Sequence, residues 1–184
     1  KAELRSAILD GVVRPDIDFN LGFSHTISHS LRNVFNDCAQ DVRCSQTYPD
    51  LARKFLMVVD QLNLKPIDVT LTVSSTKQTI GSKLNGTGFI DAILSSLTGT
   101  SEVNRLPMLI HLASRGEFGW IAEPLSGNLE TDNAKEMYHT VLCARTKSIK
   151  VMPSDVLPVP YVQTLAIAKR EADIVRNACD ALKV

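Results

Sequence analysis

Apolar side chains recur at helical intervals along most of this 184-residue chain, and this pattern constrains its fold more than any other feature. The clearest example has spacings of four, three and four residues, in Leu51, Phe55, Val58 and Leu62. Such spacing places one apolar stripe along a helix, and the stripe is expected to face a core. Pro66 should end this helix, because a proline inside a helix has no backbone N–H to donate.

The same period predicts helices over five further segments: residues 27–38, 89–97, 106–113, 133–145 and 161–182. We expect Thr87 to cap the helix that follows it, and Gly116 to end the helix that precedes it. Between residues 67 and 85 apolar and polar residues alternate, and turn residues interrupt the alternation. The sequence therefore predicts a mainly α fold with one small β-hairpin.

Residues 6–13 have the pattern of a buried strand that ends in a glycine turn. A buried strand needs neighbours, but only the hairpin segment shows another strong strand pattern. This orphan strand leads us to expect that the chain belongs to a larger protein. We therefore divide it into residues 1–16, a strand with its exit loop, and residues 17–184, a helical domain.

The charge balance excludes some partners. Twenty basic and twenty acidic side chains leave no net charge, so no electrostatic excess is present to hold a phosphate backbone or an anionic membrane. No window approaches the roughly 18 consecutive apolar residues of a membrane-spanning helix, and the first residues lack the order of a signal peptide. We expect neither nucleic acid nor a membrane as a partner.

A serine hydrolase carries its nucleophile in a Gly-x-Ser-x-Gly turn, and this motif is absent from the sequence. The nearest approach is Gly22-Phe23-Ser24-His25-Thr26, which lacks the second glycine and follows a polar stretch instead of a buried strand. We favour Ser24 as the N-cap of a helix, the ordinary role of such a serine, over a nucleophile.

Two of the four histidines, His25 and His29, have the spacing at which imidazoles on one helix face share a metal ion. His139 and Cys143 have the same spacing. Neither pair has a third ligand at a useful distance along the chain, so we favour a solvated helix face for His25 and His29. We expect no metal and no cofactor.

The four cysteines, Cys38, Cys44, Cys143 and Cys179, include no Cys-x-x-Cys pair, which argues against zinc knuckles and thioredoxin-type chemistry. In one continuous helix, six steps would hold the Cα atoms of Cys38 and Cys44 about 9 Å apart, beyond the roughly 7 Å limit for a disulfide. A bond between them requires the helix to end near Asp41. Cys143 and Cys179 lie on two late predicted helices and could cross-link them. Four free thiols are the alternative.

Trp120 is the only tryptophan, in a segment where two glycines frame two aromatic residues. This arrangement could line a pocket. A lone tryptophan beside Ile121 is more often a core residue, and we favour core packing.

The order of these segments resembles the lid of secreted prolyl and tripeptidyl aminopeptidase-like α/β-hydrolases, over nearly the whole chain. Residues 8–16, Ile-Leu-Asp-Gly-Val-Val-Arg-Pro-Asp, are similar to the core strand and exit loop that follow the nucleophile helix in that family. Residues 35–44 and 48–51 are similar to its paired-cysteine helix and the next helix. Residues 66–69, 106–110 and 141–144 continue in the same order, and Cys179 matches a cysteine just before the chain re-enters the sheet.

The resemblance implies the helical cap domain of an exported serine hydrolase, secreted or periplasmic, whose nucleophile precedes Lys1 and whose catalytic acid and histidine follow Val184. Its partners would be the catalytic core and a peptide or small ester or amide substrate. The resemblance also implies paired cysteines and no catalytic residue in this chain. We expect substrate contacts from Glu117, Trp120, Glu136 and Arg145. Arg145 stands where many relatives have an acidic residue, and its charge would repel a substrate amine.

Two other readings compete with the lid. The same helices could form a free-standing interaction module with an exposed apolar groove for a partner. A small intact enzyme that uses Ser24 and a histidine is the third, and it lacks an acid and a base placed to activate the serine. A lid separated from its core should expose an apolar surface and self-associate.

Overall fold

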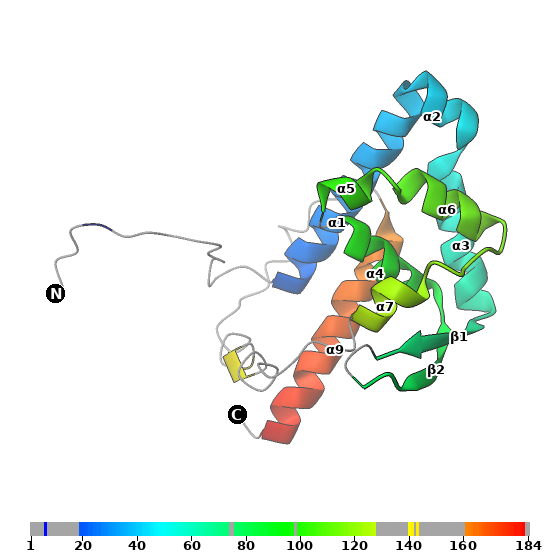
Figure 1. Cartoon of the computed structure of the whole chain (residues 1–184). Helices are drawn as coiled ribbons and strands as arrows, with labels where there is room; N and C mark the ends of the chain where they lie inside the picture. The colour runs from blue at the N-terminus through cyan, green and yellow to red at the C-terminus, as the bar shows by residue number, and fades with distance from the viewer. Residues whose placement is uncertain are drawn as a thin grey trace.

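The chain folds mainly into helices, as its apolar periods predict. The computed structural model describes residues 6, 19–73, 76–97, 99–127, 140, 141, 143 and 161–182 (Figure 1). The elements in chain order are α1 (Phe19–Gln40), α2 (Val42–Thr47), α3 (Leu51–Leu64), β1 (Ile67–Thr72), β2 (Thr79–Leu84), α4 (Gly86–Leu97), α5 (Thr100–Val103), α6 (Leu106–Ser114), α7 (Ala122–Gly127), the short 3-10 helix η2 (Val162–Thr164) and α9 (Leu165–Leu182). The sheet formed by these elements is antiparallel and has two strands.

The core lies where α1, α3, α4 and α6 meet, and α3 contacts each of the other three helices. The stripe predicted on α3 is confirmed, with these residues buried: Leu51, Phe55, Val58 and Leu62. The fully buried ring of Phe55 lies against Phe35, Phe89 and Tyr161, at centroid distances of 5.6, 6.0 and 6.1 Å. This aromatic cluster joins α3 to α1, to α4 and to the residue that precedes η2.

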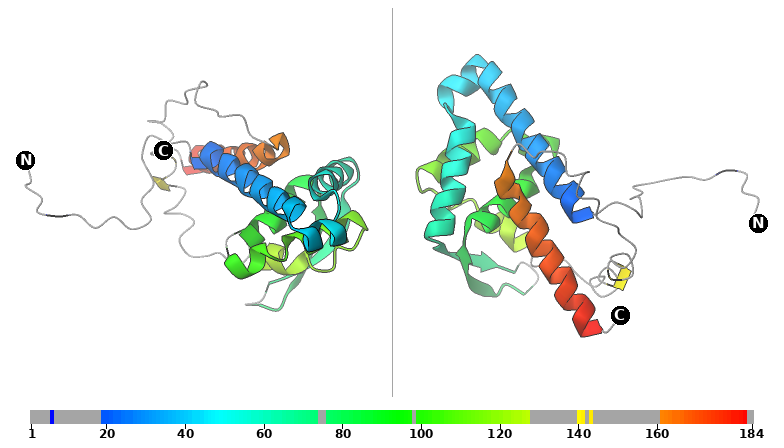
Figure 2. Two further views of the ribbon diagram at one scale, coloured as in Figure 1. Left: turned by 90° about the horizontal axis from the view of Figure 1, so that it is seen from above. Right: turned by 180° about the vertical axis from the view of Figure 1, so that it is seen from behind.

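α1 also turns its predicted apolar side to the core, with these residues buried: Ile27, Leu31, Phe35 and Cys38. α9 packs along α1 and also contacts α4 (Figure 2). The helix predicted over residues 161–182 is confirmed, with a different first turn: η2 precedes α9, which begins at Leu165. The last helix in the sequence is thus held against the first helix described.

The predicted hairpin is confirmed. β1 and β2 pair antiparallel, from Ile67 opposite Leu84 to Thr72 opposite Thr79. α7 packs against β1, where the backbone N–H of Thr72 donates to Ser126 Oγ at 3.0 Å. All residues of β2 except Leu84 are exposed, so its outer side faces solvent. The hairpin lies at the end of α3 that is remote from α2 (Figure 1).

Asn85, not Thr87, caps α4. The helix begins at Gly86, and the side-chain Oδ1 of Asn85 accepts the N–H of Gly88 at 2.9 Å, the usual N-cap hydrogen bond. A Cβ atom on Gly86 would lie 2.5 Å from the backbone oxygen of Val59, so only glycine permits α4 to start this close to α3. Gly116 follows α6 with a φ of 82°, which confirms its predicted role in ending that helix.

All four cysteines are in disulfides, Cys38–Cys44 and Cys143–Cys179, so the alternative of free thiols is wrong. α1 ends at Gln40, and Asp41 caps α2 by accepting the N–H of Cys44 at 2.7 Å. This break brings the Cα atoms of Cys38 and Cys44 to 5.1 Å, compared with about 9 Å in one continuous helix.

Some expectations fall outside the described residues. Of the orphan strand at residues 6–13, only Ser6 is described, and it is exposed and has no regular secondary structure. The proposed division after residue 16 lies outside as well. Of the helix predicted over residues 133–145, Thr140, Val141 and Cys143 are described, and all three are helical. Among the helices described, none has the length and hydropathy needed to span a bilayer.

Candidate functional site

Four polar residues on the first half of α1 form the candidate site: Ser24, His25, Ser28 and His29. We call them the α1 polar cluster. Ser24 and Ser28 are fully buried, and both histidines are half-buried. Ser24 was expected to cap a helix, and this is wrong, because α1 begins five residues earlier, at Phe19. The serine lies inside the helix at the point where η2 packs on it.

The serines of the cluster hold the start of η2 against α1. Ser28 Oγ accepts the backbone N–H of Tyr161 at 2.8 Å and lies 3.4 Å from the Tyr161 carbonyl oxygen. Thr164, also fully buried, donates its hydroxyl to the carbonyl of Tyr161 at 2.7 Å, and its Oγ1 lies 3.4 Å from the carbonyl oxygen of Ser24. Ser24 Oγ itself has no hydrogen-bond partner in the described part of the chain.

The rings of the two histidines contact one another in a tilted arrangement, one helical turn apart. Their ring centroids are 4.2 Å apart, and each Nε2 is buried without a hydrogen-bond partner among the residues described. Both rings are half-buried, so the helix face that they share is only partly solvated. Burial lowers the pKa of His29, and the charge of Arg32 and the neighbouring His25 lower it further.

The cluster supports neither a metal site nor an activated serine in the described chain. Zinc sites use three or four protein ligands, and no group of three potential ligand side chains occurs within these residues. A nucleophilic serine needs a base within hydrogen-bond reach, whereas Ser24 Oγ has no partner there. The described contacts of the cluster position Tyr161 and η2 on α1.

Two of the four expected substrate contacts are described, and both precede α7. Glu117 is exposed and forms an ion pair with Arg115, with 3.0 Å between Oε1 and Nε. Trp120 is half-buried, and its ring and that of Phe89 have an edge-to-face arrangement with a centroid distance of 6.3 Å. Its indole N–H is buried with no acceptor in the described residues. Core packing of Trp120 is thus observed. Glu136 and Arg145 lie outside the described residues.

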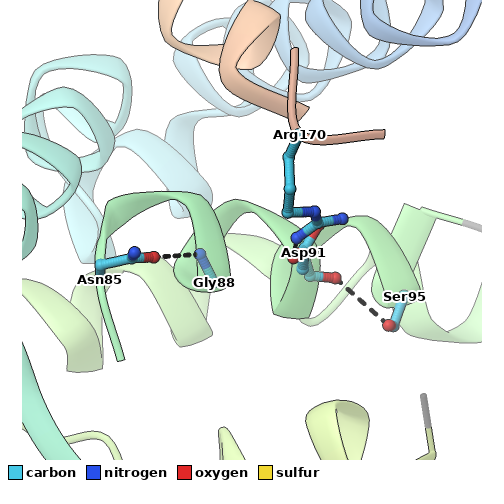
Figure 3. A network of polar contacts seen from close by, with 5 residues as sticks. All are labelled: Asn85, Gly88, Asp91, Ser95 and Arg170. Carbon is cyan, nitrogen blue, oxygen red and sulfur yellow. Dashed lines mark hydrogen bonds and ion pairs between the residues drawn. The ribbon is translucent and has the colours of Figure 1, made fainter. Parts of the chain in front are cut away.

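An ion pair between α4 and α9 was not anticipated from the sequence. The guanidinium of Arg170 lies over the carboxylate of Asp91, whose side chain is 12% exposed (Figure 3). Arg170 is 40% exposed. The sequence did indicate that Asp91 needs a partner, because this carboxylate lies between the apolar residues Ile90 and Ile93 on α4. Its partner, 79 residues away, could not be read from the sequence.

Replacing Arg170 with Met should lower the free energy of unfolding by about 2 kcal/mol. This loss lies between the losses measured when an exposed ion pair and a buried ion pair are broken. The variant keeps most of the apolar stem but leaves the mostly buried Asp91 carboxylate without this guanidinium. Urea denaturation of Asp91→Asn, Arg170→Met and the double variant would give the coupling energy. A coupling below about 0.5 kcal/mol would contradict a structural role for the pair.

The structure should lose stability as the pH falls below about 6.5, the ordinary pKa of histidine. Burial lowers the pKa of both His29 and His111. For His111, Lys54 Nζ lies 3.0 Å from Nδ1, and Lys54 and Arg115 lower the pKa further while Glu117 opposes them. Between the lowered folded-state pKa and about 6.5, the unfolded chain binds more protons, so the free energy of unfolding rises with pH in this window.

Urea denaturation at about pH 7.5 and about pH 5.5 would measure this loss. His29→Gln combined with His111→Gln should make the free energy of unfolding less dependent on pH between these values. An unchanged pH dependence in this double variant would contradict the assignment.

Two disulfides fit an extracellular protein, because such bonds persist in oxidising compartments. Comparison of the chain with models of protein families, with curated proteins and with solved structures finds no match.

Proposed function

We propose that this chain is the lid of an exported serine hydrolase of the α/β-hydrolase fold, a peptidase or an esterase-like relative. The lid covers the active site and selects the substrate, and the catalytic triad lies outside these 184 residues. The observation that carries the proposal is the pairing of Cys38 with Cys44 and of Cys143 with Cys179. Both bonds agree with the paired cysteines that the resemblance implies.

The architecture also supports this role. A lid that opens and closes over an active site works best when it moves as one body. Here the Ser28–Tyr161 hydrogen bonds tie the residue before η2 to α1. The Asp91–Arg170 pair ties α9 to α4, and a disulfide ties α9 to Cys143. These links join segments more than 30 residues apart in sequence. In this proposal they let the described helices move together as one lid.

The residues of this chain are better suited to selecting a substrate than to catalysing its hydrolysis. The sequence lacks the Gly-x-Ser-x-Gly nucleophile turn, and Ser24, the nearest approach, is buried inside a helix without a hydrogen-bonded base in the described residues. In this proposal Glu117, Trp120, Glu136 and Arg145 contact a peptide or small ester or amide substrate. The positive charge of Arg145 disfavours a free amine beside it and favours a blocked or acidic group.

Covalent labelling with a fluorophosphonate, which marks activated serines, would test the proposal. The natural gene product that contains these residues should be labelled, and peptide mapping should place the label on a serine outside residues 1–184. The 184-residue chain by itself should stay unlabelled. Label on Ser24 would instead indicate a small intact enzyme.

An unlabelled natural protein would overturn the hydrolase proposal and favour the interaction module. Self-association is a further expectation of a lid without its core. The described residues include five exposed large apolar side chains, each on a different part of the chain: Val42, Leu64, Ile80, Val141 and Ile174. Sedimentation of the 184-residue chain would measure whether copies associate.

A further inference from the structure

A single Asn-x-Ser/Thr triplet occurs in the 184 residues, at Asn85-Gly86-Thr87. This triplet is the acceptor for N-linked glycosylation in proteins that pass through a secretory compartment. We propose that Asn85 carries an N-linked oligosaccharide. The inference rests on export, which the two disulfides fit, and not on the role of the chain as a lid.

The surroundings of Asn85 leave room for a glycan. The residue is exposed and lies between the end of β2 at Leu84 and the start of α4 at Gly86. The residues that precede Leu84 on β2 are all exposed as well. A sugar chain at Asn85 would therefore extend into solvent beside the outer side of the hairpin and would displace no core residue.

The oxygen and the nitrogen of the Asn85 side-chain amide have different roles. Oδ1 accepts the N–H of Gly88 at 2.9 Å and so caps α4 (Figure 3). A glycan attaches to Nδ2, and the carbonyl oxygen stays a hydrogen-bond acceptor after the attachment. The cap and the glycan are therefore compatible on one side chain. The middle residue of the triplet, Gly86, approaches the Val59 carbonyl too closely for any Cβ. A glycan on Asn85 adds no atom to Gly86 and so does not disturb this contact.

The reaction that installs the glycan balances with a lipid-linked oligosaccharide pyrophosphate as the donor. Nδ2 of Asn85 forms a bond to C1 of the first sugar, and the C1–O bond to the pyrophosphate breaks. The lipid pyrophosphate leaves with that electron pair, and Nδ2 gives up one proton. In the folded chain Gly86, Thr87 and Gly88 belong to the first turn of α4. We therefore place the transfer before α4 forms, while the triplet is still extended.

The glycan would cover the edge of β2 that is unpaired in the described sheet. β2 pairs only with β1 within the described sheet, so its other edge offers unpaired backbone groups to another chain. Its exposed Ile80 adds an apolar side chain on the same strand. A bulky, hydrated oligosaccharide anchored one residue beyond β2 would hinder pairing of this edge with a second molecule.

The test begins with the natural protein recovered from its source. Treatment with an N-glycosidase should lower its intact mass, because the enzyme removes the glycan and converts Asn85 to aspartate. In water labelled with heavy oxygen, the peptide that contains residue 85 should then carry the oxygen label on that aspartate. Natural protein that is disulfide-bonded but bare at Asn85 would overturn the proposal.

Variants of the chain secreted from glycosylating eukaryotic cells would locate the site. Thr87→Ser should keep the glycan, and Thr87→Ala should lose it. Asn85→Asp should also lose it while it keeps a capping oxygen, so that the fold is retained. A glycan that persists in Asn85→Asp would contradict the assignment. Glycosylated natural protein without fluorophosphonate label would overturn only the hydrolase proposal, and labelled protein with a bare Asn85 would overturn only this one.

Discussion

Replacing Cys143 and Cys179 together with alanine should lower the free energy of unfolding by about 4 kcal/mol. The bond joins residues 36 apart in the sequence. A cross-link over a loop of this length lowers the conformational entropy of the unfolded chain, which accounts for the size of the effect. Alanine is the suitable replacement because Cys143 is buried, and a serine hydroxyl there would add the cost of an unpaired polar group.

The other disulfide provides the matched comparison. Cys38 and Cys44 are only six residues apart, so their replacement by alanine should cost less, about 2 kcal/mol. Urea denaturation of the wild type and both double variants would measure the two losses, and peptide mapping would verify the remaining bond in each. Equal losses, or a larger loss for the short bond, would show that loop length does not determine the stabilisation.

Replacing Phe55 with alanine should lower the free energy of unfolding by about 4 kcal/mol, the usual cost of truncating a buried phenylalanine. Its ring is completely buried and contacts three other aromatic rings, so the cavity cannot be filled by a small shift of one neighbour. The loss should appear in urea denaturation as a lower midpoint with a similar slope.

Leu64→Ala is the control on the same helix. Leu64 is 88% exposed at the end of α3, so removal of its apolar side chain should change the free energy of unfolding by no more than about 0.5 kcal/mol. If Phe55→Ala cost as little as the control, the aromatic cluster would not be the centre of the core.

Most helices and the hairpin could be predicted because their signals are local. The stripe on α3, the alternation in β1 and the termini at Pro66 and Gly116 each depend on residues within a few positions of one another. The same local logic located the helix break at Asp41 that a Cys38–Cys44 bond requires. Thr87 was a wrong cap because Asn85 supplies an equivalent oxygen two residues earlier, and the close approach of Gly86 to α3 decides where α4 begins.

The candidate site was less predictable because its surroundings come from distant segments. Ser24 and Ser28 are small polar residues, which from the sequence alone favour caps or a solvated face. They are buried because Tyr161 and Thr164, more than 130 residues later, pack on them. The triplet at Asn85 was readable directly, whereas its exposure and the separate use of its two amide atoms depend on the fold.

The sequence by itself determined the longer helices, the hairpin and the apolar faces of these helices, because backbone geometry converts residue spacing into a face. The short helices α2, α5 and α7 were not predicted. Only the tertiary structure decided that α9 lies along α1 and that Arg170 meets Asp91. It also confirmed the bond between Cys143 and Cys179, which the sequence offered beside the alternative of free thiols. Four cysteines allow three pairings, and one apolar stripe can pack on several others. The selection among them depends on how all the side chains fill one core at the same time, a property that no single segment contains.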